Sequence, residues 1–115
     1  KRTTIEEIYN DAEDIKLKNN KITAIGIKIK NNRLPKMQYM GIMKIKYDDY
    51  FKLNKFYKKL RNKNIDFTSF INLVLKNNII EISYTRNYSF WTEIDSKKDL
   101  DAANILIRSK EVKFI

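Results

Sequence analysis

The stretch FWTEIDSKKDL, residues 90–100, predicts a strand that runs directly into a helix. Alternate side chains of a strand share a face, so Trp91, Glu93 and Asp95 are expected to point the same way. Ser96 and Asp99 then have the spacing of a capping box, which marks a helix start. Open α/β sheets place ligands at the carboxyl ends of strands, just before helices. The alternative is an edge strand with a solvated acidic face.

Two segments nearer the N-terminus also have strand character. Residues 13–17 and 22–30 alternate between apolar and polar side chains around the turn signal Asn19-Asn20, which indicates a β-hairpin. Residues 38–46 are almost continuously apolar, which indicates a strand buried on both faces. Gly41 in the middle of this segment indicates a bulge or a close approach by another backbone or a ligand.

Helices are expected next along the chain. One begins near Asp48 and has an apolar stripe opposite a lysine-rich side, and another begins at the N-cap residue Asp66. Residues 79–85 then alternate as a strand, and the last helix runs from Lys97 to Arg108. A short helix or turn is expected at residues 3–10 and a short strand at 112–115. The predicted fold class is α/β, with a mixed, mostly β-sheet flanked by helices in a single domain, residues 1–115.

Composition excludes several kinds of site. The 115 residues contain no cysteine and no histidine, which excludes disulfides, zinc-type Cys/His sites, thiol nucleophiles and imidazole bases. A metal would therefore be a hard cation held by carboxylates, with magnesium the natural candidate. No apolar run approaches the ~20 residues of a membrane helix, and no signal peptide is recognisable. These features fit a cytoplasmic protein.

The formal net charge of +10 favours phosphate-bearing partners and salt-dependent binding to nucleic acid. The basic residues are spread along the chain, however, and the composition is rich in Lys, Asn and Ile overall. We therefore interpret the charge mostly as background composition and a solvated surface. No segment has the paired aromatic residues of an RNA-binding strand or the pattern of a recognition helix, so a nucleic-acid-binding module ranks last among the functions considered.

Three blocks of sequence resemble, in order and spacing, the carboxyl-terminal half of a sugar-phosphate-type nucleotidyltransferase. The most similar branch contains phosphocholine cytidylyltransferases and the transferase domains joined to phosphoenolpyruvate mutase. The blocks span most of residues 12–103. They are AEDIKL with NKITAIG (residues 12–17 and 20–26), QYMGIMKI (residues 38–45) and WTEIDS followed by DL (residues 91–96 and 99–100).

The resemblance implies half of a Rossmann-like, glycosyltransferase-A-like fold and a reaction of nucleotidyl transfer. A phosphate or phosphonate oxygen of the acceptor attacks the α-phosphorus of a nucleoside triphosphate, with CTP the expected nucleotide, and pyrophosphate leaves with the help of Mg²⁺. It implies that Asp95 is a catalytic metal ligand and that Lys44 reaches the interior of the site. It also implies that Glu93 and Trp91 line the acceptor pocket, where the indole could hold an ammonium head group such as that of phosphocholine.

The chain also departs from the pattern of this family. Ile27 stands where the hairpin normally has a lysine, and Lys28, one residue later, faces the other side unless a bulge intervenes. Gln38 stands where a glutamate is usual. Lys28 and Gln38 are still kept as candidate substrate-binding residues. No Gly-rich loop for a triphosphate is present, because the only glycines are Gly26 and Gly41 in separate segments.

The expected protein is therefore the acceptor-side half of the transferase domain, without the N-terminal nucleotide-binding half and inactive by itself. The missing half would lie in the same gene or in a separate chain, and a homodimer is an alternative partner for an exposed sheet edge. A second hypothesis, allowed by Ile27 and Gln38, is a non-catalytic binding or assembly domain derived from the same fold.

Overall fold

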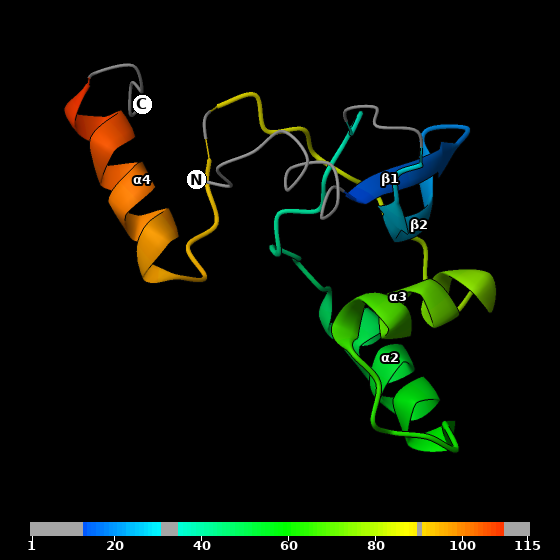
Figure 1. The fold of residues 1–115 in the computed structure, drawn as a ribbon. Coiled ribbons are helices and arrows are strands. Elements are labelled where there is room, and N and C mark those ends of the chain that lie inside the picture. The colour runs from blue at the N-terminus through cyan, green and yellow to red at the C-terminus, as the bar shows by residue number, and fades with distance from the viewer. Residues whose placement is uncertain (1–12, 31–34, 90, 110–115) are drawn as a thin grey trace.

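A β-hairpin and three helices are the regular elements of the described residues, 13–30, 35–89 and 91–109, of a computed structural model (Figure 1). The elements predicted at residues 3–10 and 112–115 lie outside these ranges. The described elements are β1 (Glu13–Lys18), β2 (Lys21–Lys28), α2 (Tyr47–Lys59), α3 (Phe67–Lys76) and α4 (Lys97–Arg108). At this level the chain is a small α/β protein.

The predicted hairpin is confirmed. Strands β1 and β2 pair antiparallel, with Leu17 opposite Ile22 and Lys16 opposite Ala24. Asn19 and Asn20 join them with φ angles of 50° and 60°, the left-handed conformation that a two-residue hairpin turn requires at both positions and that asparagine tolerates well. The turn residues therefore determine where the hairpin reverses.

Gly26 lets α3 approach the hairpin closely. Its φ is +65°, and a Cβ at this position would collide with Cγ2 of Thr68 and lie 3.3 Å from Oε2 of Glu13. A larger residue would therefore be strained in its backbone and would also push the start of α3 away from β2.

The core lies where α3 covers β2. Ile22, Ile25 and Ile71 form its centre, and Ile71 is fully buried. Helix α3 contacts β2, and α2 packs on α3 (Figure 1). The partly buried apolar side chains around this centre come from β1, from α3 and from two extended segments: Ile15, Leu17, Tyr39, Met43, Phe70, Leu75, Ile82 and Tyr84.

Asn72 of α3 fastens this helix to the edge of β2. Its Oδ1 accepts a hydrogen bond from the backbone N–H of Ile25 at 2.9 Å, and its Nδ2 donates to the carbonyl oxygen of Ile25, also at 2.9 Å. One side-chain amide thus satisfies both backbone polar groups of a residue that is 2% exposed. Because buried backbone groups must be paired, this contact fixes the register of α3 on the strand.

The three other predicted strands do not form. Residues 38–46, 79–85 and 91–95 are not part of any sheet, and the described sheet is the two-stranded antiparallel pair β1–β2 instead of a mixed sheet. Among the described residues, one backbone hydrogen bond joins the hairpin to these segments, from the N–H of Ile22 to the carbonyl oxygen of Ile82 at 3.3 Å. The alternation of apolar and polar residues identified segments suited to strands. A strand also needs the free edge of a neighbouring strand for its hydrogen bonds, and Asn72 occupies the free edge of β2 at Ile25.

The helices begin as predicted. Asp66 caps α3 by accepting from the backbone N–H of Ser69 at 2.8 Å. Ser96 and Asp99 form a complete capping box at the start of α4. Helix α2 begins at Tyr47 after Lys46, whose side chain makes no cap hydrogen bond, and Asp48 and Asp49 in its first turn favour the helix through its dipole.

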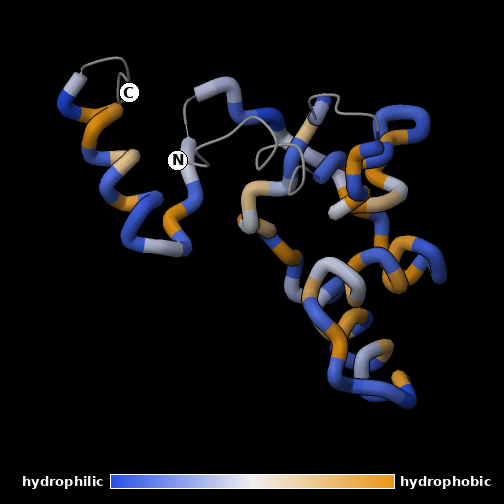
Figure 2. The backbone as a smooth tube through the Cα atoms, in the orientation of Figure 1, coloured by the Kyte–Doolittle hydropathy of each residue, from blue (hydrophilic) through white to orange (hydrophobic). Residues whose placement is uncertain are grey.

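Helix α4 stands apart from the other elements. It contacts none of the described strands and other helices, although Ala103 on one side of it is buried (Figure 1). Apolar and hydrophilic residues alternate along its turns, as in an amphipathic helix (Figure 2). None of the helices within the described ranges combines the length and the apolar character that a membrane span needs.

Replacing Asn72 with leucine should lower the free energy of unfolding by about 1–3 kcal/mol for each of the two Ile25 groups left unpaired. Asn77→Ala is the matched control, because the Asn77 amide only donates to the carbonyl of Leu73 at the exposed end of the same helix. Urea denaturation measures both variants. Equal losses of stability would contradict the role of Asn72.

The helix caps predict a loss of helix in acid. The side chain of Ser69, and then its backbone N–H, lower the pKa of Asp66, and the side chain of Ser96 lowers the pKa of Asp99. A carboxyl group whose pKa is lower in the folded than in the unfolded state stabilises the folded state. This stabilisation is complete above the pKa of the unfolded state, near 4, and is lost as the pH falls through the pKa of the folded state. Far-UV circular dichroism should therefore be constant from neutral pH to about pH 4 and fall below it.

Asp66→Asn and Asp99→Asn should each make this transition shallower. Asp101→Asn is the control, because Asp101 lies in the same helix turn as Asp99 but outside the capping box. An identical acid transition in all three variants would exclude the caps as its cause.

Candidate functional site

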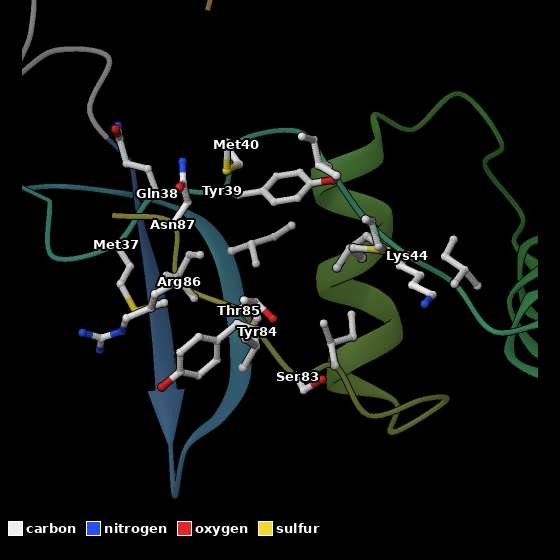
Figure 3. Close-up of a pocket in the computed structure, with 18 of the residues that line it drawn as sticks. Met37, Gln38, Tyr39, Met40, Lys44, Ser83, Tyr84, Thr85, Arg86 and Asn87 are labelled. Atoms are coloured by element: carbon white, nitrogen blue, oxygen red, sulfur yellow. The ribbon is translucent and has the colours of Figure 1, made fainter. Parts of the chain in front are cut away.

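A cavity of about 1190 Å³ lies between the hairpin, α3 and the two extended segments 35–46 and 80–88. Three residues from the sequence analysis line it: Gln38 and Lys44 from the first extended segment, and Trp91, which is distant from them in the chain. Figure 3 shows residues of the first segment around Tyr39 facing those of the second around Tyr84. The failure of these segments to pair as strands leaves the space between them open.

The lining of this cavity has an excess of positive charge. Its two carboxylates are both in ion pairs, Glu81 with Lys21 at 2.5 Å and Asp49 with Lys52 at 2.9 Å. The cavity is therefore suited to an anion, because most of its cations have no carboxylate partner among the described residues. The cationic lining residues are Lys36, Lys44, Lys46, Lys52 and Arg86.

Aromatic rings line the same cavity. Tyr39, Tyr84, Tyr88 and Trp91 all contribute to it. Tyr39 is partly buried against the core, and this burial raises the pKa of its hydroxyl. Trp91 is 36% exposed and Tyr88 86% exposed, so their rings remain accessible to a ligand. Rings and cations together suit a molecule with an anionic group and an apolar or cationic remainder.

Asp14 holds the beginning of the first extended segment in place. It is 6% exposed, and its Oδ1 accepts hydrogen bonds from the backbone N–H groups of Ile15 at 2.9 Å and Met37 at 3.0 Å. Met37 is adjacent to Gln38, so this buried carboxylate orients part of the cavity wall. The sequence analysis missed Asp14, because no local pattern indicates a partner 23 residues away.

The remaining predicted site residues lie elsewhere. Glu93 lines a second hollow of about 540 Å³, together with Tyr39 and Gly41. Asp95 is exposed and lines neither of these two cavities, and its backbone N–H donates to Oδ2 of Asp99 at 3.3 Å. The expectation that residues 91, 93 and 95 share one strand face is wrong, because this segment is not a strand.

Lys28 also lies outside the large cavity. It is exposed at the end of β2, where its backbone lies opposite that of Glu13 in the register of the hairpin. The irregular register between Asp14 and Lys16 shows that the hairpin does contain a bulge or irregularity, but Lys28 is still not among the residues that line the cavity.

Asp95 would provide one carboxylate to a magnesium ion. Within residues 13–30, 35–89 and 91–109, no three Asp, Glu, His or Cys side chains lie close enough together to hold a metal. Magnesium commonly takes one or two protein carboxylates and completes its shell with water and substrate phosphates. The donor chemistry of Asp95 therefore fits a magnesium ion that is bound together with a phosphorylated substrate.

No protein-family model, curated protein or solved structure matches this chain. Function therefore has to be argued from the residues that surround the cavity.

Asp14→Ala should lower the free energy of unfolding by about 1–3 kcal/mol, because the N–H of Met37 loses its acceptor. Asp14→Asn should cost less, since an amide oxygen can still accept that hydrogen bond. Glu13→Ala, which removes the exposed carboxylate next in sequence, is the control and should change stability little. If urea denaturation shows the same stability for Asp14→Ala as for Glu13→Ala, the proposed anchoring of Met37 is wrong.

Proposed function

We propose that this chain is the acceptor-binding part of a magnesium-dependent nucleotidyltransferase and that the large cavity receives a phosphorylated acceptor. The main support is that Gln38 and Lys44 from the second block of the family resemblance and Trp91 from the third line one cavity. The cationic lining agrees with a phosphate or phosphonate group on the ligand. The resemblance makes CTP the expected nucleotide and a phosphocholine- or phosphonate-like molecule the expected acceptor.

In this proposal the chain positions the acceptor and does not grip the triphosphate. Lys44 attracts the anionic part of the acceptor, and the accessible face of Trp91 takes a cationic head group by cation–π attraction. Gln38 offers both a hydrogen-bond donor and an acceptor from the same wall. The proposal extends the fold assignment to half of a Rossmann-like transferase domain, completed by a nucleotide-binding half.

Asp95 is the residue of this chain that would hold Mg²⁺. When bound, the ion offsets the negative charge of the phosphates and orients them for in-line displacement. Asp95 does not line the cavity in this structure, so its carboxylate would supply one ligand to the ion from outside the cavity lining. The position of Asp95 also favours a second candidate function, a non-catalytic domain that binds phosphorylated ligands without a metal.

Trp91 is the only tryptophan, so its fluorescence reports on the proposed site directly. Titration with phosphocholine should give a saturable change in the wild-type chain, and Lys44→Gln should weaken binding about threefold, as expected for loss of a cation that attracts the ligand. Lys55→Gln, on the exposed side of α2 and outside the cavity lining, is the matched control and should bind like the wild type. A wild-type chain that gives no saturable response would overturn the acceptor-binding proposal.

Magnesium distinguishes the two candidate functions. If Asp95 shares an ion with the ligand, Mg²⁺ should increase the affinity of the wild type for phosphocholine. Asp95→Asn should then remove the increase caused by Mg²⁺ and leave the affinity without Mg²⁺ unchanged. Ser96→Ala weakens the cap of α4 but leaves the Asp95 carboxylate in place, so it controls for an effect of Asp95→Asn on the helix. Binding that is saturable but indifferent to Mg²⁺ in the wild type would favour the non-catalytic binding domain.

A further inference from the structure

Arg86 has a distinctive setting in the wall of the cavity. Tyr84, Arg86 and Tyr88 are two residues apart on an extended segment, and all three line the cavity. The guanidinium carbon of Arg86 lies 5.9 Å from the centre of the Tyr84 ring, within the range of a cation–π contact. Hydrogen bonding to the side chain of Tyr88, with a smaller effect of Tyr84, raises the pKa of Arg86. The guanidinium thus lies over one phenol ring of the cavity wall, that of Tyr84.

These neighbours hold the guanidinium without neutralising it. A tyrosine ring can contact a guanidinium through its π face without supplying a carboxylate. The carboxylates of the cavity wall, Asp49 and Glu81, are paired with lysines. Arg86 therefore has an aromatic neighbour and, among the described residues, no carboxylate partner.

We infer that Arg86 is the residue that binds the phosphate or phosphonate group of the ligand in this cavity. The inference rests on the proposed acceptor site and names its main anion contact. A guanidinium presents a planar fork of N–H donors that matches two oxygens of a phosphate, whereas an ammonium group acts as a point charge. An arginine that already contacts the Tyr84 ring loses less conformational freedom when it makes such a contact.

The other cations of the predicted site do not compete for this role. Lys28 lies outside the cavity lining, and Lys44 lies on the opposite side of the pocket from Arg86 (Figure 3). Met37, Tyr84 and Arg86 gather on one side, so a phosphate there would be flanked by an apolar and an aromatic side chain (Figure 3). Lys44 is then left to attract the ligand through longer-range charge, or to contact a second anionic group.

The test compares Arg86→Gln and Arg86→Lys with the control Arg61→Gln, which removes an exposed arginine outside the cavity lining. The probes are phosphocholine, inorganic phosphate and choline, measured by Trp91 fluorescence and calorimetry. Arg86→Gln should weaken phosphocholine and phosphate binding by tenfold or more, and Arg86→Lys by less, because a charge remains. Arg61→Gln should stay within twofold of the wild type, and choline binding should not respond to Arg86.

The outcomes separate the inference from the proposed function. Wild-type binding of phosphocholine that Arg86→Gln leaves unchanged overturns the role of Arg86 and leaves the acceptor site standing. Absence of phosphocholine and phosphate binding in the wild type overturns both. Circular dichroism and thermal melting of each variant exclude loss of the fold, which is not expected because Arg86 is exposed.

Discussion

The pair of hydrogen bonds between the Asn72 amide and the backbone of Ile25 is the constraint on which the described structure depends. It joins α3 to the edge of β2 at the most enclosed point of the hairpin, and it places Ile71 directly in the core. Gly26 makes this arrangement sterically possible, since a Cβ there would collide with Thr68. The Asn72 side chain makes the hydrogen bonds that a neighbouring strand would make to Ile25. The N–H and C=O groups of Ile25 are therefore not available to a further strand at this edge of β2.

The cavity is a consequence of this arrangement. With the β2 edge occupied at Ile25, the segments 35–46 and 80–88 run alongside the hairpin as extended chain, and both are anchored to it. Asp14 holds the first segment through the N–H of Met37, and the N–H of Ile22 holds the second through the carbonyl of Ile82. Cationic and aromatic side chains of both segments then line the space between them. The local balance of charge around this cavity is more informative than the net charge of the whole chain, because the carboxylates that line it are already paired.

Local signals in the sequence predicted local structure well. Asn19-Asn20 specified the hairpin turn, and Ser96 with Asp99 specified the start of α4, because in both cases the interacting groups lie within a few residues of each other. The predicted strands at residues 38–46, 79–85 and 91–95 were wrong, because alternation reports which side chains suit a strand and not whether an edge is available for pairing. The site was predicted in the same uneven way. Gln38, Lys44 and Trp91 share a cavity, whereas Glu93 and Asp95, only a few residues from Trp91, do not line it.

The sequence by itself determined the hairpin, the helices that begin at Asp66 and Ser96, and the absence of cysteine and histidine chemistry, because each follows from short-range hydrogen bonding or from composition alone. Only the tertiary structure decided how many strands the described sheet has, which side chains surround the cavity, and that Asp14, Asn72 and Arg86 hold or line its walls. These features depend on contacts between residues that are far apart in the chain, such as the 47 positions between Ile25 and Asn72. No local pattern records such contacts, since they exist only when packing brings the two segments together.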